Sequence, residues 1–152
     1  MARRQRDRVY ESEDALIGPV SWYASVQGAQ FHVDAFLRSK WWRTRSKVTH
    51  VEILYPLKTT GAYRIDDTHW RIEFSPRALC DLNVAHELTH VLMGVTQGQT
   101  PDDHDADHSA HYAGAELEVV KHFLNADIAR RLRESFNETG AKYAEAPGPP
   151  LG

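Results

Sequence analysis

The sequence predicts an α+β fold in which helices precede and follow a small antiparallel sheet. Apolar residues recur at the 3.6-residue spacing of a helix in the first third and the last half of the chain. Residues 48–74 are instead rich in β-branched and aromatic residues, which favour strands. With 152 residues the chain is long enough for one domain with its own core. We therefore expect a single domain over residues 1–143, followed by a flexible proline- and glycine-rich tail over residues 144–152.

The local patterns predict five helices and three strands. The helices are expected over residues 6–17, 29–43, 79–95, 108–124 and 127–139, and the strands over residues 48–55, 63–65 and 69–74. The last two strands alternate apolar and polar residues on either side of Asp66 and Asp67, which is the pattern of a β-hairpin. A polar, acidic loop is expected over residues 97–107.

The composition restricts the possible functions. A net charge of −3 argues against a protein that wraps nucleic acid by bulk electrostatics. The single cysteine, Cys80, excludes an intramolecular disulfide and a four-cysteine zinc module, and it is expected to be a small packed residue. No apolar run is long enough for a membrane span or a signal peptide, so a cytoplasmic location is expected. With nine histidines in the chain, a transition-metal site would use imidazole and carboxylate ligands.

Residues His86 to His90 form an H-E-x-x-H motif within the strongest predicted helix. At 100° per residue, the apolar residues of this helix lie on one side, and His86 and His90 lie together on the other, one turn apart. Two imidazoles at this spacing can bind one zinc ion, and Glu87 can reach a water molecule in the open coordination position. Gly94 is expected either to end the helix or to allow another segment to approach it.

The third metal ligand must come from further along the chain, because Met93 and Thr96 break the extended metzincin pattern. Spacing alone does not choose among the residues that could supply it. If the next helix starts near residue 107, His108 and His111 lie one turn apart and at least one of them could face the active helix. The candidate third ligands are His104, His108, His111, Glu116 and Glu118.

The motif Ala85-His-Glu-Leu-Thr-His90, followed by His108-Ser-Ala-His-Tyr112, resembles the SprT-like zinc metallopeptidases. It looks most similar to a branch of short metallohydrolases from actinomycetes and their phages, in which a Gln-Arg-x-x-Val-Tyr segment, here residues 5–10, precedes a small sheet and the H-E-x-x-H helix. This resemblance implies a zincin-like fold with His86, His90 and His108 as zinc ligands and Glu87 as the catalytic base. Ser109 and Tyr112 stand where the family usually has glycine and an aromatic Phe or Trp.

The reaction implied is metal-assisted hydrolysis of an amide bond in a protein or peptide substrate. Glu87 would take a proton from the attacking water and pass it to the leaving amine. His111 and Tyr112 are candidates for a second electrophile, although Tyr112 is also expected to be a buried packing residue. Residues 69–74 are the candidate strand for aligning an extended peptide, because they immediately precede the active helix.

Two other classes of function are compatible with parts of the sequence. A closed site with four ligands, His86, His90, His108 and His111, would be that of a zinc-stabilised binding module, such as a phage or host-interaction accessory protein without hydrolytic activity. Nucleic-acid binding would need a basic, aromatic surface. The residues that could form it are Arg3, Arg4, Arg6, Arg8, Lys40, Arg43, Arg45 and Lys47 with Trp41 and Trp42. Those two tryptophans are expected instead to pack the second helix onto the sheet.

Overall fold

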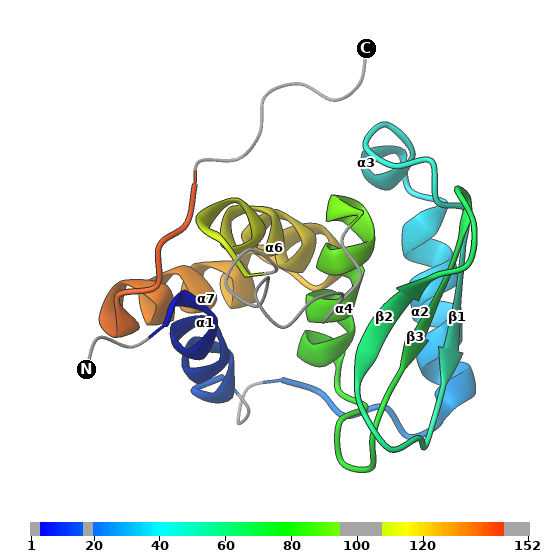
Figure 1. The fold of residues 1–152 in the computed structure, drawn as a ribbon, viewed down its shortest axis with the longest axis horizontal. Helices are drawn as coiled ribbons and strands as arrows, with labels where there is room; N and C mark the ends of the chain where they lie inside the picture. Colours follow the sequence, from blue (N-terminus) through cyan, green and yellow to red (C-terminus); the bar gives the residue numbers. More distant parts are fainter. Residues whose placement is uncertain (1–3, 17–19, 95–107, 145–152) are drawn as a thin grey trace.

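The computed structural model describes residues 4–16, 20–94 and 108–144. The expected loop over residues 97–107, which contains His104, and residues 145–152 of the expected tail lie outside these ranges. The described chain has an α+β architecture (Figure 1). Its helices are α1 (Gln5–Asp14), α2 (Val26–Leu37), α3 (Lys40–Arg43), α4 (Asp81–Met93), α6 (Ala110–Phe123) and α7 (Ala126–Thr139), and its strands are β1 (His50–Leu54), β2 (Gly61–Arg64) and β3 (His69–Glu73).

The sheet is mixed, so the expectation of an antiparallel sheet was wrong. Its strand order is β1-β3-β2. The hairpin prediction is confirmed, because β2 and β3 pair antiparallel. However, β1 pairs parallel to β3, with Val51 opposite Trp70. The chain leaves β1, passes to the far position to form β2, and returns between them as β3, an arrangement that strand periodicity cannot reveal.

This strand order also changes which strand could align a peptide. The expected strand, β3, is central and has a partner on each side, so its backbone cannot pair with another chain. The outer edge of β1 is occupied by the side chain of Gln30 on α2, which donates to the Val51 oxygen at 2.8 Å and accepts from the Ile53 nitrogen at 2.9 Å. The remaining edge of the sheet belongs to β2, which packs beside α4.

The second expected helix is divided in two at Ser39. The Ser39 hydroxyl accepts a hydrogen bond from the Trp42 nitrogen at 3.2 Å and thereby caps a new helix, α3. The turn buries Trp42 completely, and its indole Nε1 donates to the Val48 oxygen at 2.8 Å. Trp42 is therefore a packing residue, as expected.

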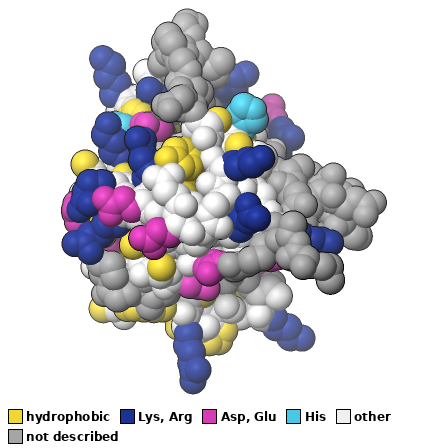
Figure 2. Space-filling view, turned by 90° about the vertical axis from the view of Figure 1, so that its left-hand side faces the viewer, with side chains coloured by type: hydrophobic (Ala, Val, Ile, Leu, Met, Phe, Trp, Pro, Cys, Tyr) yellow, Lys and Arg dark blue, Asp and Glu magenta, His cyan; other side chains and the backbone are white. Residues whose placement is uncertain are grey.

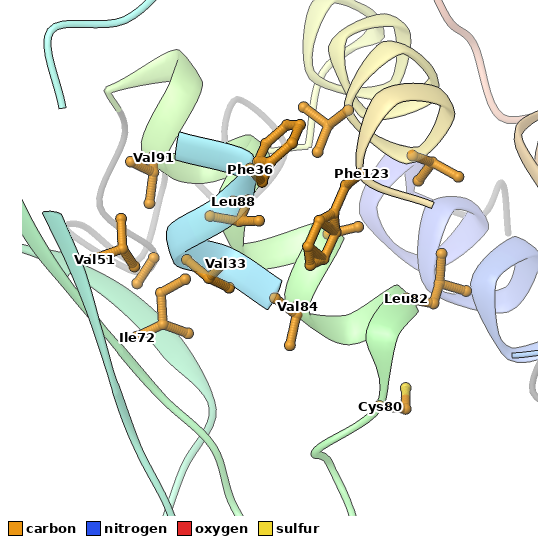
Figure 3. Close-up of a cluster of buried hydrophobic side chains, with 14 of the residues drawn as sticks. Val33, Phe36, Val51, Ile72, Cys80, Leu82, Val84, Leu88, Val91 and Phe123 are labelled. Carbon is orange, nitrogen blue, oxygen red and sulfur yellow. The ribbon is translucent and has the colours of Figure 1, made fainter. Parts of the chain in front are cut away.

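The core lies between the sheet and the helices α2, α4 and α6 (Figure 3). This cluster includes Leu88 and Val91 of α4, Val33 of α2 and Ile72 of β3. Cys80, which directly precedes α4, is buried and makes no disulfide. Helix α4 ends at Gly94 in the left-handed conformation, with φ of 71°, so the glycine has the helix-ending role.

The first helix and the last residues of the described chain pack against α7 and α6, respectively. Helix α1 packs on α7, and the Ser12 hydroxyl shares a hydrogen bond of 2.7 Å with the Thr139 hydroxyl. The backbone of Ala144 donates to the Ala110 oxygen at 2.8 Å, and a Cβ atom on Gly114 would collide with the Ala144 oxygen. Helix α1, from the start of the sequence, is thereby held against the helices that carry the candidate site.

Candidate metal centre

Three buried histidines from two separate segments meet beside α4. His86 and His90 lie one turn apart on α4 and are 5% and 0% exposed. His108, which is 1% exposed, immediately precedes the capping residue of α6, Ser109. The Ser109 hydroxyl accepts from the Tyr112 nitrogen at 3.3 Å, so α6 begins at Ala110 and not near residue 107. His108 consequently lies outside the helix and is directed by the turn toward α4.

The ring nitrogens of these histidines have the spacing of a metal site. One ring nitrogen from each of His86, His90 and His108 lies within 4.8 Å of the others. The Nε2 atoms of His86 and His108 are 3.3 Å apart. Two nitrogens bound to one zinc ion at about 2.0–2.1 Å with tetrahedral geometry are separated by about 3.3–3.4 Å. The observed separation therefore matches one edge of a zinc tetrahedron.

His90 provides an independent test of whether a metal fits. Its side chain is fully buried, yet neither ring nitrogen has a hydrogen-bond partner in the described part of the chain. Burial, together with the neighbouring His86 and His108, holds the pKa of His90 well below its usual value, so the ring is neutral at pH 7. A neutral imidazole with a free lone pair is the form that binds zinc, and coordination would satisfy a nitrogen that is otherwise costly to bury.

Two buried carboxylates surround the opposite nitrogen of His86. The Nδ1–H of His86 donates to Glu13 of α1, and Glu116 of α6 lies 3.5 Å from the same nitrogen. Burial alone would lower the pKa of His86, but Glu13 and Glu116 reverse this effect and raise it well above its usual value. Burial and the nearby Glu116 likewise raise the pKa of Glu13. Because Nδ1 is engaged in this way, Nε2 of His86 faces His108.

Sequence reasoning missed Glu13 and gave Glu116 a different position. Glu116 was a candidate ligand, but it lies behind His86 and not among the three converging histidines. Glu13 belongs to a helix of mostly charged residues and carries no motif. The available signal was its position four residues after Val9, which is 0% exposed, on the inward face of α1.

Glu87 lies beside His86 at the edge of a pocket. Its side chain is 3% exposed, and Oε2 has no hydrogen-bond partner among the described residues. Burial raises the pKa of Glu87 to about 7, close to the optimum for accepting and returning a proton at neutral pH. The carboxylate borders a pocket of about 220 Å³. The lining residues are Tyr10, Glu13, Asp14, Thr60, Ala78, Asn83, His86 and Glu87.

The other candidate residues described by the structure contribute no atom to the cluster of three histidine nitrogens. His111 is exposed on α6 and does not belong to the histidine cluster. Glu118 has an oxygen 3.7 Å from Nε2 of His122 on the same helix, outside the histidine cluster. Tyr112 is 1% exposed and its hydroxyl donates to the His86 backbone oxygen at 2.8 Å, so it is a packing residue tied to α4.

Some residues of the candidate nucleic-acid surface contact other parts of the protein, and Arg3 lies outside the described residues. Arg8 donates to the Gly140 oxygen at 3.0 Å, and Trp41 stacks on His122 with ring centroids 4.6 Å apart. The guanidinium of Arg45 lies 4.6 Å from the centre of the Trp41 ring. On the side of the molecule where α1 lies, basic and acidic side chains are interspersed (Figure 2).

No protein-family model, curated protein or solved structure matches the chain. Within the described residues, no helix is both long and apolar enough to cross a membrane.

Proposed function

We propose that the protein is a zinc-dependent metallohydrolase with a zincin-like site, which cleaves amide bonds in peptides or proteins. The observation that carries the proposal is the convergence of three buried histidines, with 3.3 Å between the His86 and His108 nitrogens and an unpartnered His90. His86, His90 and His108 would hold the ion. The resemblance of residues 85–112 to the SprT-like metallopeptidases supports the same assignment.

The chain's own residues supply the proton transfers. When bound, zinc would lower the pKa of a water molecule on it toward about 7 and polarise the substrate carbonyl. Glu87, whose Oε2 is buried and free of hydrogen bonds within the described chain, would accept the water proton. It would then donate this proton to the leaving amine, as a base with a pKa of about 7 can.

The three histidine ligands found within the described residues favour an enzyme over a closed structural zinc site. A structural site fills all four positions with protein atoms, whereas a catalytic site keeps one open. His111, the candidate for the fourth ligand, is exposed. Glu87 also has no function in a purely structural site, although it is costly to bury as a charged group.

Chelation is expected to abolish hydrolysis and zinc to restore it. A mixture of unstructured peptides would be incubated with the protein, and new amino termini would be counted by mass spectrometry. Removal of the metal with a chelator should reduce the cleavage rate to background, and one equivalent of zinc should recover it. Zinc binding without cleavage of any peptide would identify a binding module instead, and cleavage that persists after complete metal removal would exclude the mechanism.

The edge of β2 is the proposed position for an extended substrate. This strand packs beside α4, and Thr60, which directly precedes it, borders the pocket that contains Glu87. A peptide added to this edge would form backbone hydrogen bonds, each contributing about 0.5–1.5 kcal/mol. Methylation of one backbone nitrogen that pairs with β2 should therefore slow cleavage of a substrate peptide by about 2- to 12-fold. The control is the same peptide methylated at its far terminus. Equal cleavage of every methylated peptide would exclude this mode of binding.

A further inference from the structure

Helix α1 contributes two side chains to His86, although it is distant from the H-E-x-x-H motif in the sequence. Tyr10 and Glu13 lie three residues apart and therefore share one face of α1. The Tyr10 ring stacks on the His86 ring with centroids 5.6 Å apart and an interplanar angle of 22°. The Glu13 carboxylate accepts the His86 Nδ1–H. The imidazole is thus contacted at its face and at its outer nitrogen by the same helix.

We propose that Glu13 is a positioning residue of the metal centre, which fixes His86 in the tautomer and orientation needed to bind a metal through Nε2. A histidine ligand commonly donates its second ring N–H to a carboxylate, which makes the imidazole a better donor to the metal. Here the carboxylate is 6% exposed and comes from a separate helix. The inference rests on the metal site of the proposed function and adds a residue that the motif does not contain.

Glu116 brings a second carboxyl group to the same position. It is 0% exposed, and one of its oxygens lies 3.5 Å from Nδ1 of His86. With Glu13 it brings two carboxylates to the side of His86 away from the other histidines. A divalent cation bound by the histidines would be attracted by any negative charge on these two buried carboxyl groups, because charges interact more strongly in the protein interior than in water.

The docking of α1 is built to hold Glu13 in place. The Gln5 side-chain amide donates to the Lys142 oxygen at 2.7 Å and accepts from the Lys142 nitrogen at 2.9 Å. Near the other end of α1, the Ser135 hydroxyl donates to the Ser12 oxygen at 2.9 Å. These contacts hold α1 against α7 and the residues that follow it. They restrict both the shift of α1 along its axis and its rotation about that axis, and thereby the direction of Glu13.

The test compares the metal affinity of three variants with that of the wild type. Glu13→Gln keeps the size of the side chain and an oxygen that can accept the Nδ1–H, but it removes the charge. Its zinc affinity, measured by competition with a chromophoric chelator, should fall by about 10- to 100-fold. Glu11→Gln is the matched control, because it makes the same change at an exposed position of the same helix. Gln5→Ala loosens the docking of α1 without changing the carboxylate.

The outcomes separate a positioning role from a structural one. We expect Glu11→Gln to bind zinc like the wild type, and Gln5→Ala to lose much less affinity than Glu13→Gln. The visible spectrum of bound cobalt should change in Glu13→Gln, because His86 is less firmly oriented, while the far-ultraviolet circular dichroism stays the same. Wild-type affinity in Glu13→Gln, or an equal loss in Glu11→Gln, would overturn the proposal while leaving the proposed function intact.

Two further outcomes are decisive. One metal ion per chain is expected. If the wild type binds a second ion that is lost in Glu116→Gln, the carboxylates are ligands of another metal and the positioning role is wrong. If the wild type binds no zinc, both this inference and the proposed function fail.

Discussion

Zinc is expected to stabilise the folded protein strongly, by about 4 kcal/mol when free zinc exceeds its dissociation constant a thousandfold. The physical reason is that the three histidines come together only in the folded state, so the free energy of metal binding adds to that of folding. In the metal-free protein, the buried His90 has no partner for either ring nitrogen within the described residues. Unfolding by heat or urea, with zinc or with a chelator, measures the difference.

The matched variants are His108→Ala and His111→Ala. His108→Ala removes a buried ligand, and it should abolish most of the stabilisation by zinc and the stoichiometric metal content of the purified protein. His111→Ala changes an exposed residue of the neighbouring helix and should retain both. Equal stabilisation of the two variants by zinc, or loss of metal from His111→Ala, would refute the ligand set.

Glu87→Ala is expected to retain zinc and lose hydrolysis. General-base catalysis contributes about 10²- to 10⁴-fold to a rate, so the turnover of the variant should fall by a factor in this range. The zinc content should not fall, because Glu87 is not one of the three converging groups. Turnover would be measured with the best peptide from the cleavage screen, and metal content by atomic emission.

Two controls make this result specific. Glu87→Gln keeps the size of the side chain and should be as inactive as Glu87→Ala. Glu138→Ala changes an exposed glutamate of α7 and should have the wild-type rate. An unchanged rate in both Glu87 variants would exclude Glu87 as the base, whereas lost zinc would show that Glu87 holds the ion.

The parts predicted well from the sequence are those fixed by neighbours along the chain. The placement of His86 and His90 on one face of α4 follows from helical periodicity, and the β2–β3 hairpin from alternation around a short turn. The division of α2 from α3 also has a local signal, the capping residue Ser39.

The parts predicted badly depend on segments far apart in the sequence. The parallel pairing of β1 with β3 depends on how the whole sheet packs its buried residues, such as Trp70 and Ile72 of β3, against the helices. No local sequence pattern predicts this pairing. The role of Glu13 is similar, because an acidic residue in a charged helix looks solvated until α7 positions that helix.

The sequence by itself determined the chemistry that is available: two histidines and a glutamate at helical spacing, further histidines downstream, and no cysteine pair. Only the tertiary structure decided which groups meet. It buries His108 and exposes His111, although the two are three residues apart, because Ser109 starts the helix after His108. It also places Glu13 and Glu116 behind His86. The spacing of residues in the sequence determines the relative directions of side chains only within one helix or strand. Contacts between helices and strands depend on how the whole core packs.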